Sequence, residues 1–183
     1  MFILPTFSAE EYSIFLNTTS QLGAQNTPNS WIMNLTFALL GCVCIFEGFL
    51  HLKNLWVQKV LLISFGIGLI FTAIFQHAPI NEAIPYNLLE DNIHSVSASV
   101  VGFSFTLFAF SVAFIENTDK RRILALLIGL LSIGLSLLMF IVTNYTGVWQ
   151  RLIFIISFGW MIYFFEGRKI KKTECAHCTF MLI

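Results

Sequence analysis

Four side chains near the middle of the chain have the chemistry of a functional site. Asp91 and Glu90 precede His94 by three and four positions, so a helix beginning near Leu88 would carry all three on one face. His77 ends the preceding apolar stretch and could approach them. Because imidazole titrates near neutrality, this set predicts acid–base catalysis, and two imidazoles with a carboxylate also form a metal-ligand set. The competing interpretation is structural: acidic residues favour a helix N-terminus, and His94 is an interfacial residue. The spacing selects no particular metal, and no cofactor is predicted.

A second candidate is the cation that opens the last apolar stretch. Arg151 follows Trp149 closely, and its planar guanidinium suits a lipid phosphate or another anion. It could also pair with Glu90, Asp91 or Glu11. Snorkelling of the side chain at the membrane interface is the competing explanation.

Further groups could act only if the fold brings partners to them. Ser20 would be a nucleophile if His94 approached it, and otherwise Ser20 and Asn34 would cap or tether the segment before the first helix. Glu47 lies inside an apolar stretch, where it could relay protons or reach the headgroup region. The tail carries Cys175 and Cys178, which with the histidine between them give at most three zinc ligands.

Composition indicates the elements that position these residues. The chain of 183 residues is 57% hydrophobic and 11% charged, whereas soluble domains carry about 25% charged residues. Five apolar stretches are long enough to cross ~30 Å of hydrocarbon, and inside lipid such stretches must be helices. We therefore predict an all-α, polytopic transmembrane bundle with these five spans: Trp31–Leu50, Val60–Gln76, Ser95–Ile115, Ile123–Val142 and Leu152–Phe165.

The basic residues predict the orientation of the bundle. Of the ten Lys and Arg residues, all except Arg151 fall in three regions that alternate along the chain, 51–59, 116–122 and 167–183. Basic loops stay in the cytoplasm. The prediction is a bacterial inner-membrane protein with a cytoplasmic C-terminus and with three outer segments, 1–30, 77–94 and 144–150.

The chain reads as one integral membrane domain, 1–183, made of an outer segment (1–30), a bundle (31–166) and a basic tail (167–183). Small residues recur at helical spacing in the third stretch, which predicts close helix packing, with a substrate groove as the alternative. They are Ser95, Ser99, Gly102 and Thr106.

Four short motifs, each at the outer end of a predicted helix, carry a resemblance to a known family. They are Ser20-Gln21-Leu22-Gly23 with Trp31 and Asn34 beyond it, Phe75–Pro79 including His77, His94–Ala98, and Gly147–Arg151. Together they resemble the bacterial and archaeal domain of unknown function 998 family of integral membrane proteins, over roughly residues 10–166. The resemblance implies a membrane fold and draws attention to Ser20, Gly23, Asn34, His77 and Arg151, but it implies no reaction.

The chain departs from the family pattern at two places. Family members usually carry six helices, with one more before the Ser-x-Leu-Gly motif, where this chain has only a short apolar start. The family's Phe-Pro step reads Phe75-Gln76 here. We therefore expect five helices, with the first family helix missing or truncated.

Two classes of function fit these observations. The first is small-molecule or lipid binding, or a role in transport, with a polar site at the outer face and a tunnel lined by Ser99, Gly102, Thr106 and Ser136. The second is a membrane-embedded enzyme acting on a lipid or lipid-linked substrate, with His94 as acid or base, Asp91 or Glu90 orienting it, and Arg151 holding an anion. Membrane lipids are the expected partners. The net charge of zero provides no basic field for nucleic acid.

Overall fold

The computed structural model describes residues 2–81 and 83–180, with side chains as far as Arg168. Five long helices follow one another along the chain, and the described residues contain no strand. They are α2 (Ser30–His51), α3 (Trp56–Ile74), α4 (Leu88–Ala113), α5 (Asp119–Ile141) and α6 (Thr146–Phe180). Each contains a segment long and apolar enough to cross a membrane, which confirms the predicted all-α polytopic bundle.

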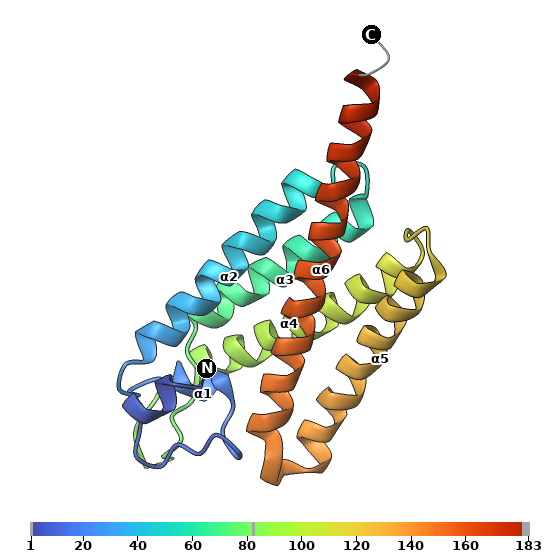
Figure 1. Ribbon diagram of the computed structural model, residues 1–183. Helices are drawn as coiled ribbons and strands as arrows, with labels where there is room; N and C mark the ends of the chain where they lie inside the picture. Colours follow the sequence, from blue (N-terminus) through green and yellow to red (C-terminus); the bar gives the residue numbers. More distant parts are fainter. Residues whose placement is uncertain (1, 82, 181–183) are drawn as a thin grey trace.

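Short elements precede and join these helices. The 3-10 helix η1 (Leu4–Phe7) and the single turn α1 (Thr19–Leu22) lie before α2, and the 3-10 helix η2 (Thr143–Tyr145) joins α5 to α6. Residues 2–29 gather at one end of the bundle with the α3–α4 connection and the α5–α6 corner, as Figure 1 shows. We call this the capped end, and the opposite end, where α6 projects, the tail end.

α3 and α5 each begin four residues before their predicted starts, and two other helices extend further beyond their predicted bounds. α4 begins seven residues before the predicted Ser95, because the side chain of Asn87 accepts hydrogen bonds from the amides of Leu89 (3.0 Å) and Glu90 (3.4 Å). Such an N-cap satisfies amides that have no partner within the helix. α6 continues beyond the predicted Phe165 through the basic tail, whose Lys and Arg residues favour helix and are not followed by a proline.

Glycines set the closest helix contacts. A Cβ placed on Gly41 of α2 would lie 2.5 Å from the carbonyl oxygen of Gly66 in α3, and the reverse distance is 2.6 Å. Gly68 of α3 likewise faces Val101 of α4. The predicted stripe does not serve this purpose, since Ser99 is exposed and a Cβ on Gly102 would meet nothing within 4 Å. The packing role predicted for these two residues is therefore wrong.

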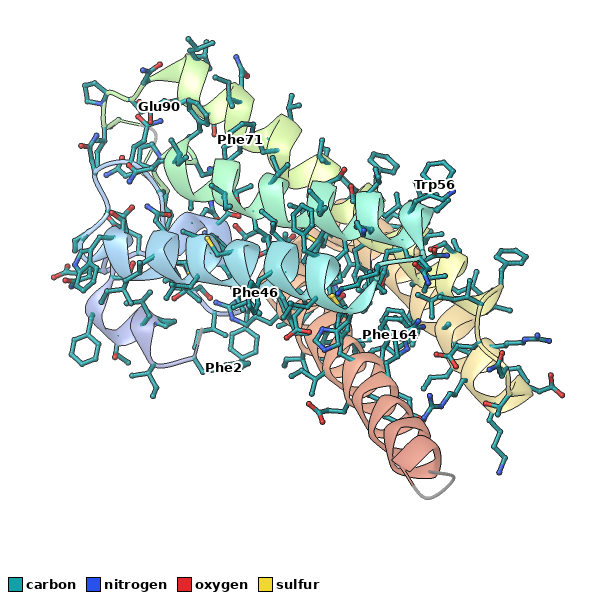
Figure 2. The ribbon with its side chains drawn as sticks, turned by 90° about the horizontal axis from the view of Figure 1, so that it is seen from above. Phe2, Phe46, Trp56, Phe71, Glu90 and Phe164 are labelled. Carbon is teal, nitrogen blue, oxygen red and sulfur yellow. The ribbon has the colours of Figure 1, made fainter. Side chains whose placement is uncertain are left out.

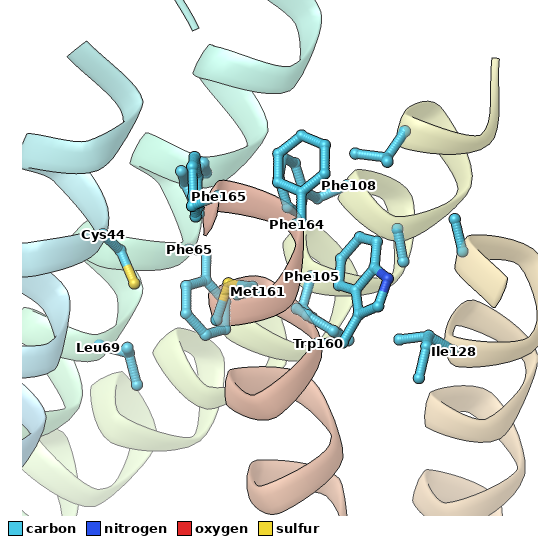
Figure 3. Close-up of a cluster of buried hydrophobic side chains, with 14 of the residues drawn as sticks. Cys44, Phe65, Leu69, Phe105, Phe108, Ile128, Trp160, Met161, Phe164 and Phe165 are labelled. Carbon is cyan, nitrogen blue, oxygen red and sulfur yellow. The ribbon is translucent and has the colours of Figure 1, made fainter. Parts of the chain in front are cut away.

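α6 packs by a different mechanism, through aromatic rings. Its Phe154 meets Phe37 of α2 and its Phe158 meets Phe65 of α3, with ring centroids 5.9 Å apart in both pairs. Deeper in the bundle, Trp160 contacts Phe105 and Phe108 of α4, and Phe164 also contacts Phe108, as Figure 3 shows. Large rings hold α6 at a distance from α2, α3 and α4 while filling the space between them.

Candidate functional site at the capped end

The Ser-x-Leu-Gly motif forms a tight turn that rests on the start of α2. Thr18 and Gln21 cap α1 reciprocally, and Leu22 is fully buried. The Asn34 side chain donates a hydrogen bond to the carbonyl of Gly23 (3.1 Å), and a Cβ on Gly23 would lie only 2.1 Å from the Asn34 oxygen. The motif therefore needs glycine for a close approach to Asn34. Ser20 is buried in this turn, and no hydrogen bond among the described residues joins it to His94.

Arg151 binds the chain segment that precedes this turn. Its side chain is only 2% exposed. Nη1 donates to the carbonyls of Ile14 (2.9 Å), Asn17 (3.1 Å) and Gly147 (2.8 Å), and Nη2 donates to the Tyr12 hydroxyl (2.5 Å). The Tyr12 hydroxyl donates in turn to the Thr18 carbonyl (2.8 Å) or the Asn17 carbonyl (3.1 Å). We call this group the arginine clamp.

Gly147 is what lets the segment come close enough for the clamp. A Cβ at this position would lie 2.3 Å from the carbonyl oxygen of Asn17 and 2.4 Å from that of Ile14. The Gly147 amide also donates to the carbonyl of Phe15 (2.9 Å). The family's Gly-x-x-x-Arg motif thus has a joint physical explanation here: the glycine opens the space in which the arginine meets backbone carbonyls.

The clamp contains no carboxylate. Among the side chains that the structure describes, neither Glu90, Asp91 nor Glu11 forms an ion pair with Arg151. Carbonyl dipoles and a phenol surround the charge instead, and Nε is buried without a hydrogen-bond partner. Burial raises the pKa of Tyr12 above its usual value, and the adjacent positive charge of Arg151 offsets part of this effect. Tyr12 therefore remains a neutral phenol at physiological pH.

Two glutamines connect the remaining capped-end segments. The Gln150 side-chain oxygen accepts from the amide (2.6 Å) and hydroxyl (2.7 Å) of Thr19. The Gln25 side chain donates to the carbonyls of Gln76 (3.1 Å) and Asn87 (3.0 Å) and accepts from the Asn87 amide (2.7 Å). The sequence did not single out Tyr12, Gln25 or Gln150 as site residues. For the two glutamines one signal was available, because uncharged amide side chains gather near predicted helix ends.

His94 lies in α4 against the C-terminal end of α3 and is 2% exposed. Its Nδ1 is 2.8 Å from the carbonyl oxygen of Phe75 and 3.2 Å from that of Thr72. Carbonyls only accept hydrogen bonds, so Nδ1 carries the proton and Nε2 presents a lone pair. Nε2 is buried and has no partner among the described residues. His94 therefore satisfies carbonyls at the end of α3 and also holds a buried, unused base.

The structure brings the His77 ring to His94, and Asp91 to His77. The two imidazole rings are 5.2 Å apart in a T-shaped arrangement. Asp91 accepts a hydrogen bond from the Ala78 amide (2.8 Å) and lies 3.5 Å from Nδ1 of His77. Glu90 instead contacts the Asn87 side chain (3.3 Å). No group of three or more His, Cys, Asp or Glu side chains in the described part of the chain could hold a metal ion.

The other predicted residues lie apart from this cluster. Trp149 donates to the carbonyl of Val142 (3.3 Å) and does not contact the guanidinium of Arg151 among the described interactions. Glu47 pairs with His51 (2.8 Å) near the tail end. The side chains of Cys175 and Cys178 lie outside the described residues. Arg151 and His94 thus belong to two groups with different neighbours, and no described contact joins them.

A groove of about 460 Å³ lies between α3 and α4. Gly68 and the buried Ser97 are its small residues, and the Ser97 hydroxyl donates to the carbonyl of Ile93 (2.7 Å). The remaining lining is apolar except for Asn92, which is exposed and lies toward the capped end. The apolar lining residues are Ile67, Phe71, Ile93, Val96 and Val100.

Five apolar helices with polar caps at one end define a multi-pass α-helical membrane protein. Residues 1–165 match the family model described as a protein of unknown function, DUF998, and the chain belongs to that family. This match confirms the family that the four motifs indicated. Neither the curated proteins nor the solved structures give a match to the chain.

Proposed function

We propose that the protein binds a membrane lipid, whose apolar chain occupies the groove between α3 and α4. The observation that carries this proposal is the groove itself, about 460 Å³ in volume, within the 300–1,000 Å³ typical of small-molecule sites. Its apolar walls lie on helices that are suited to cross the membrane, so the acyl chains of the bilayer are its natural occupants.

The distribution of polar groups supports a lipid with its headgroup toward the capped end. Asn92 is the exposed polar side chain of the groove and lies in the second turn of α4. The basic residues gather at the opposite end. Lys53 and Lys59 lie on the α2–α3 connection and in the first turn of α3, Lys120, Arg121 and Arg122 lie in the first turn of α5, and the others except Arg151 lie in the C-terminal part of the sequence, from Arg168 on. By the positive-inside rule, the capped end faces outward, the C-terminus is cytoplasmic, and the lipid belongs to the outer leaflet of a bacterial inner membrane.

The lipid proposal is tested by filling the groove. Val96→Trp and Val100→Trp place a large ring in its wall, and Leu130→Trp puts the same ring on an exposed position of α5 as the control. Native mass spectrometry of protein extracted in mild detergent measures the bound lipid. We expect a lipid adduct on the wild type and on Leu130→Trp, and its loss from both groove variants. Equal lipid occupancy in all four proteins would contradict the proposal.

A second candidate, a membrane-embedded enzyme acting on a lipid or lipid-linked substrate, is favoured by one specific observation. The carbonyl contacts at Nδ1 orient the imidazole ring of His94 and leave the lone pair of Nε2 unused. His77 and Asp91 lie nearby. A fixed, neutral imidazole of this kind suits a general base. This candidate rests on His94, His77 and Asp91, because Arg151 is engaged with backbone carbonyls.

Two substitutions separate catalysis from helix capping. In His94→Asn the side-chain amide can still donate to the carbonyl of Phe75 but has no equivalent of Nε2, whereas His94→Ala loses both functions. The purified proteins are incubated with a bacterial lipid extract, and the products are identified by mass spectrometry. If His94 is the base, the wild type converts a lipid species and the well-folded His94→Asn variant does not. A lipid profile unchanged by the wild type removes the enzyme candidate.

A further inference from the structure

The N-terminal segment presents an apolar surface at the capped end. Between residues 2 and 17, five large apolar side chains are more than half exposed: Phe2, Ile3, Phe7, Phe15 and Leu16. Ile3 reaches 77% exposure and Phe7 61%. Phe2 lies at the periphery of the capped end in Figure 2. A cluster of this kind on a protein surface marks an interaction site.

Hydrogen bonds tie the backbone of this segment to the rest of the capped end. The arginine clamp binds the carbonyls of Ile14 and Asn17, and the Gly147 amide binds the carbonyl of Phe15. Farther along, the Asn29 side chain donates to the carbonyl of Phe7 (2.7 Å). Leu4 is buried and Tyr12 faces Arg151. The chain thus directs Leu4 and Tyr12 inward, leaves Ile14 half-buried, and turns the five exposed apolar side chains outward.

These outward residues lie level with the ends of the membrane-crossing helices. The Phe15 ring contacts Tyr145 at the α5–α6 corner, with centroids 6.4 Å apart, and Tyr145 contacts Trp149. Trp31 is exposed in the first turn of α2. Trp and Tyr concentrate where a bilayer meets water. The apolar surface is therefore continuous with the aromatic belt of the bundle.

We infer that residues 2–16 form an interfacial membrane anchor, which inserts Phe2, Ile3, Phe7, Phe15 and Leu16 among the lipids of the leaflet at the capped end. The partner is the lipid surface itself, because the same belt that contacts this segment borders the lipid-facing sides of the helices. Glu10 and Glu11 are exposed between the two apolar groups and face the aqueous side. The inference is independent of the groove between α3 and α4.

Photo-crosslinking tests the anchor in the 183-residue chain. The photoreactive residue p-benzoylphenylalanine replaces Phe2, Phe7 or Phe15, each of which already carries an exposed phenyl ring. Replacement at Phe103, exposed within α4, is the positive control, and replacement at Glu10 is the control from the same segment. The proteins are irradiated in vesicles of phosphatidylethanolamine and phosphatidylglycerol, and adducts are weighed by mass spectrometry.

We expect phospholipid adducts at positions 2, 7 and 15 in yields close to that at 103 and several-fold above that at 10. Unmodified protein at the three positions, with lipid adducts at 103, overturns the inference. Adducts of twice the protein mass also overturn it, because they identify a second copy of the chain as the partner. Gel filtration before irradiation verifies that each variant is folded.

Discussion

At the scale of single residues, the capped end depends on glycines placed where another chain segment must pass. Gly23 admits the Asn34 side chain, and Gly147 admits two carbonyls that Arg151 then binds. In both motifs the conformation depends on a close contact between two chain segments, which explains why the motif residues are small or polar. A larger side chain at position 147 would displace the backbone at Ile14 and Asn17, and one at position 23 would displace the Asn34 side chain.

Gly147→Ala should release the N-terminal segment. The added Cβ would lie within 2.4 Å of two backbone oxygens, and such overpacking typically costs about 1–3 kcal/mol. Gly159→Ala, on the same helix with nothing within 4 Å of the new Cβ, is the matched control. Limited proteolysis should cut residues 8–17 faster in Gly147→Ala and at the wild-type rate in Gly159→Ala. Equal cutting in both variants would show that the segment is held elsewhere.

Tyr12→Phe should weaken the same clamp by about 1–3 kcal/mol, because it leaves an Arg151 donor and the Thr18 carbonyl without their partner. Tyr86→Phe, at an exposed position, is the control. The measurement is the thermal stability of the detergent-solubilised proteins, and equal stability of Tyr12→Phe and wild type would contradict the role of the hydroxyl.

The stabilisation that the Tyr12 hydroxyl contributes should decrease at high pH. Burial raises the pKa of Tyr12 in the folded protein, whereas an unfolded tyrosine titrates near a pKa of about 10. The folded state therefore holds the phenolic proton more tightly, and the stabilisation is fully present below about pH 10 and lost as the pH rises through the raised value. The stability difference between wild type and Tyr12→Phe should narrow above about pH 10, and a difference that widens there would contradict the assignment.

At the scale of elements, the helices use two kinds of contact that sequence analysis distinguishes poorly. Small residues bring α2, α3 and α4 close together at Gly41, Gly66 and Gly68, while aromatic rings space α6 away from them. The periodic stripe through Ser99 and Gly102 matched the small-residue pattern equally well, yet it faces outward. Periodicity identifies a face of a helix but not the neighbour that the face meets.

Gly66→Ala should therefore destabilise the bundle more than Gly102→Ala. The new Cβ in Gly66→Ala would lie 2.6 Å from the Gly41 carbonyl oxygen, and the one in Gly102→Ala meets nothing within 4 Å. We expect a loss of about 1–3 kcal/mol for the first variant and no loss for the second. Thermal unfolding followed by tryptophan fluorescence compares them. A larger loss for Gly102→Ala would restore the packing role of the stripe.

The sequence predicted the five spans well, and the capped end only in part. Hydropathy is sufficient for the spans because a backbone that crosses lipid must be helical. The placement of Asp91 near His94 follows from helix spacing, and that of His77 from its position at the end of the preceding apolar stretch. The arginine clamp could not be predicted. Two of its acceptors are backbone carbonyls 134 and 137 residues away in the chain, and a backbone carbonyl is present in every residue, so the sequence does not mark it. The early start of α4 was missed for a related reason, because hydropathy does not register the Asn87 cap.

At the scale of the whole molecule, the two ends of the bundle differ in charge and in construction. The connections 52–55 and 114–118 meet α6 at the tail end, where Arg121 lies 3.7 Å from Glu116 and over the Tyr163 ring. The capped end carries one described basic side chain, Arg151, which is buried. By the positive-inside rule, this excess of Lys and Arg residues at the tail end predicts that the tail end is cytoplasmic.

Cysteine accessibility tests this orientation. With Cys42 and Cys44 replaced by alanine, Glu10→Cys reports on the capped end, and the native tail cysteines at 175 and 178 report on the other. A membrane-impermeant maleimide added to intact bacterial spheroplasts should label Glu10→Cys and leave the tail unlabelled until the cells are lysed. Five spans require the two reporters to lie on opposite sides whichever way the bundle inserts. Labelling of both reporters from the same side would contradict the five-span fold. Labelling of the tail alone would show that the bundle has the opposite orientation, with the groove and the anchor in the inner leaflet.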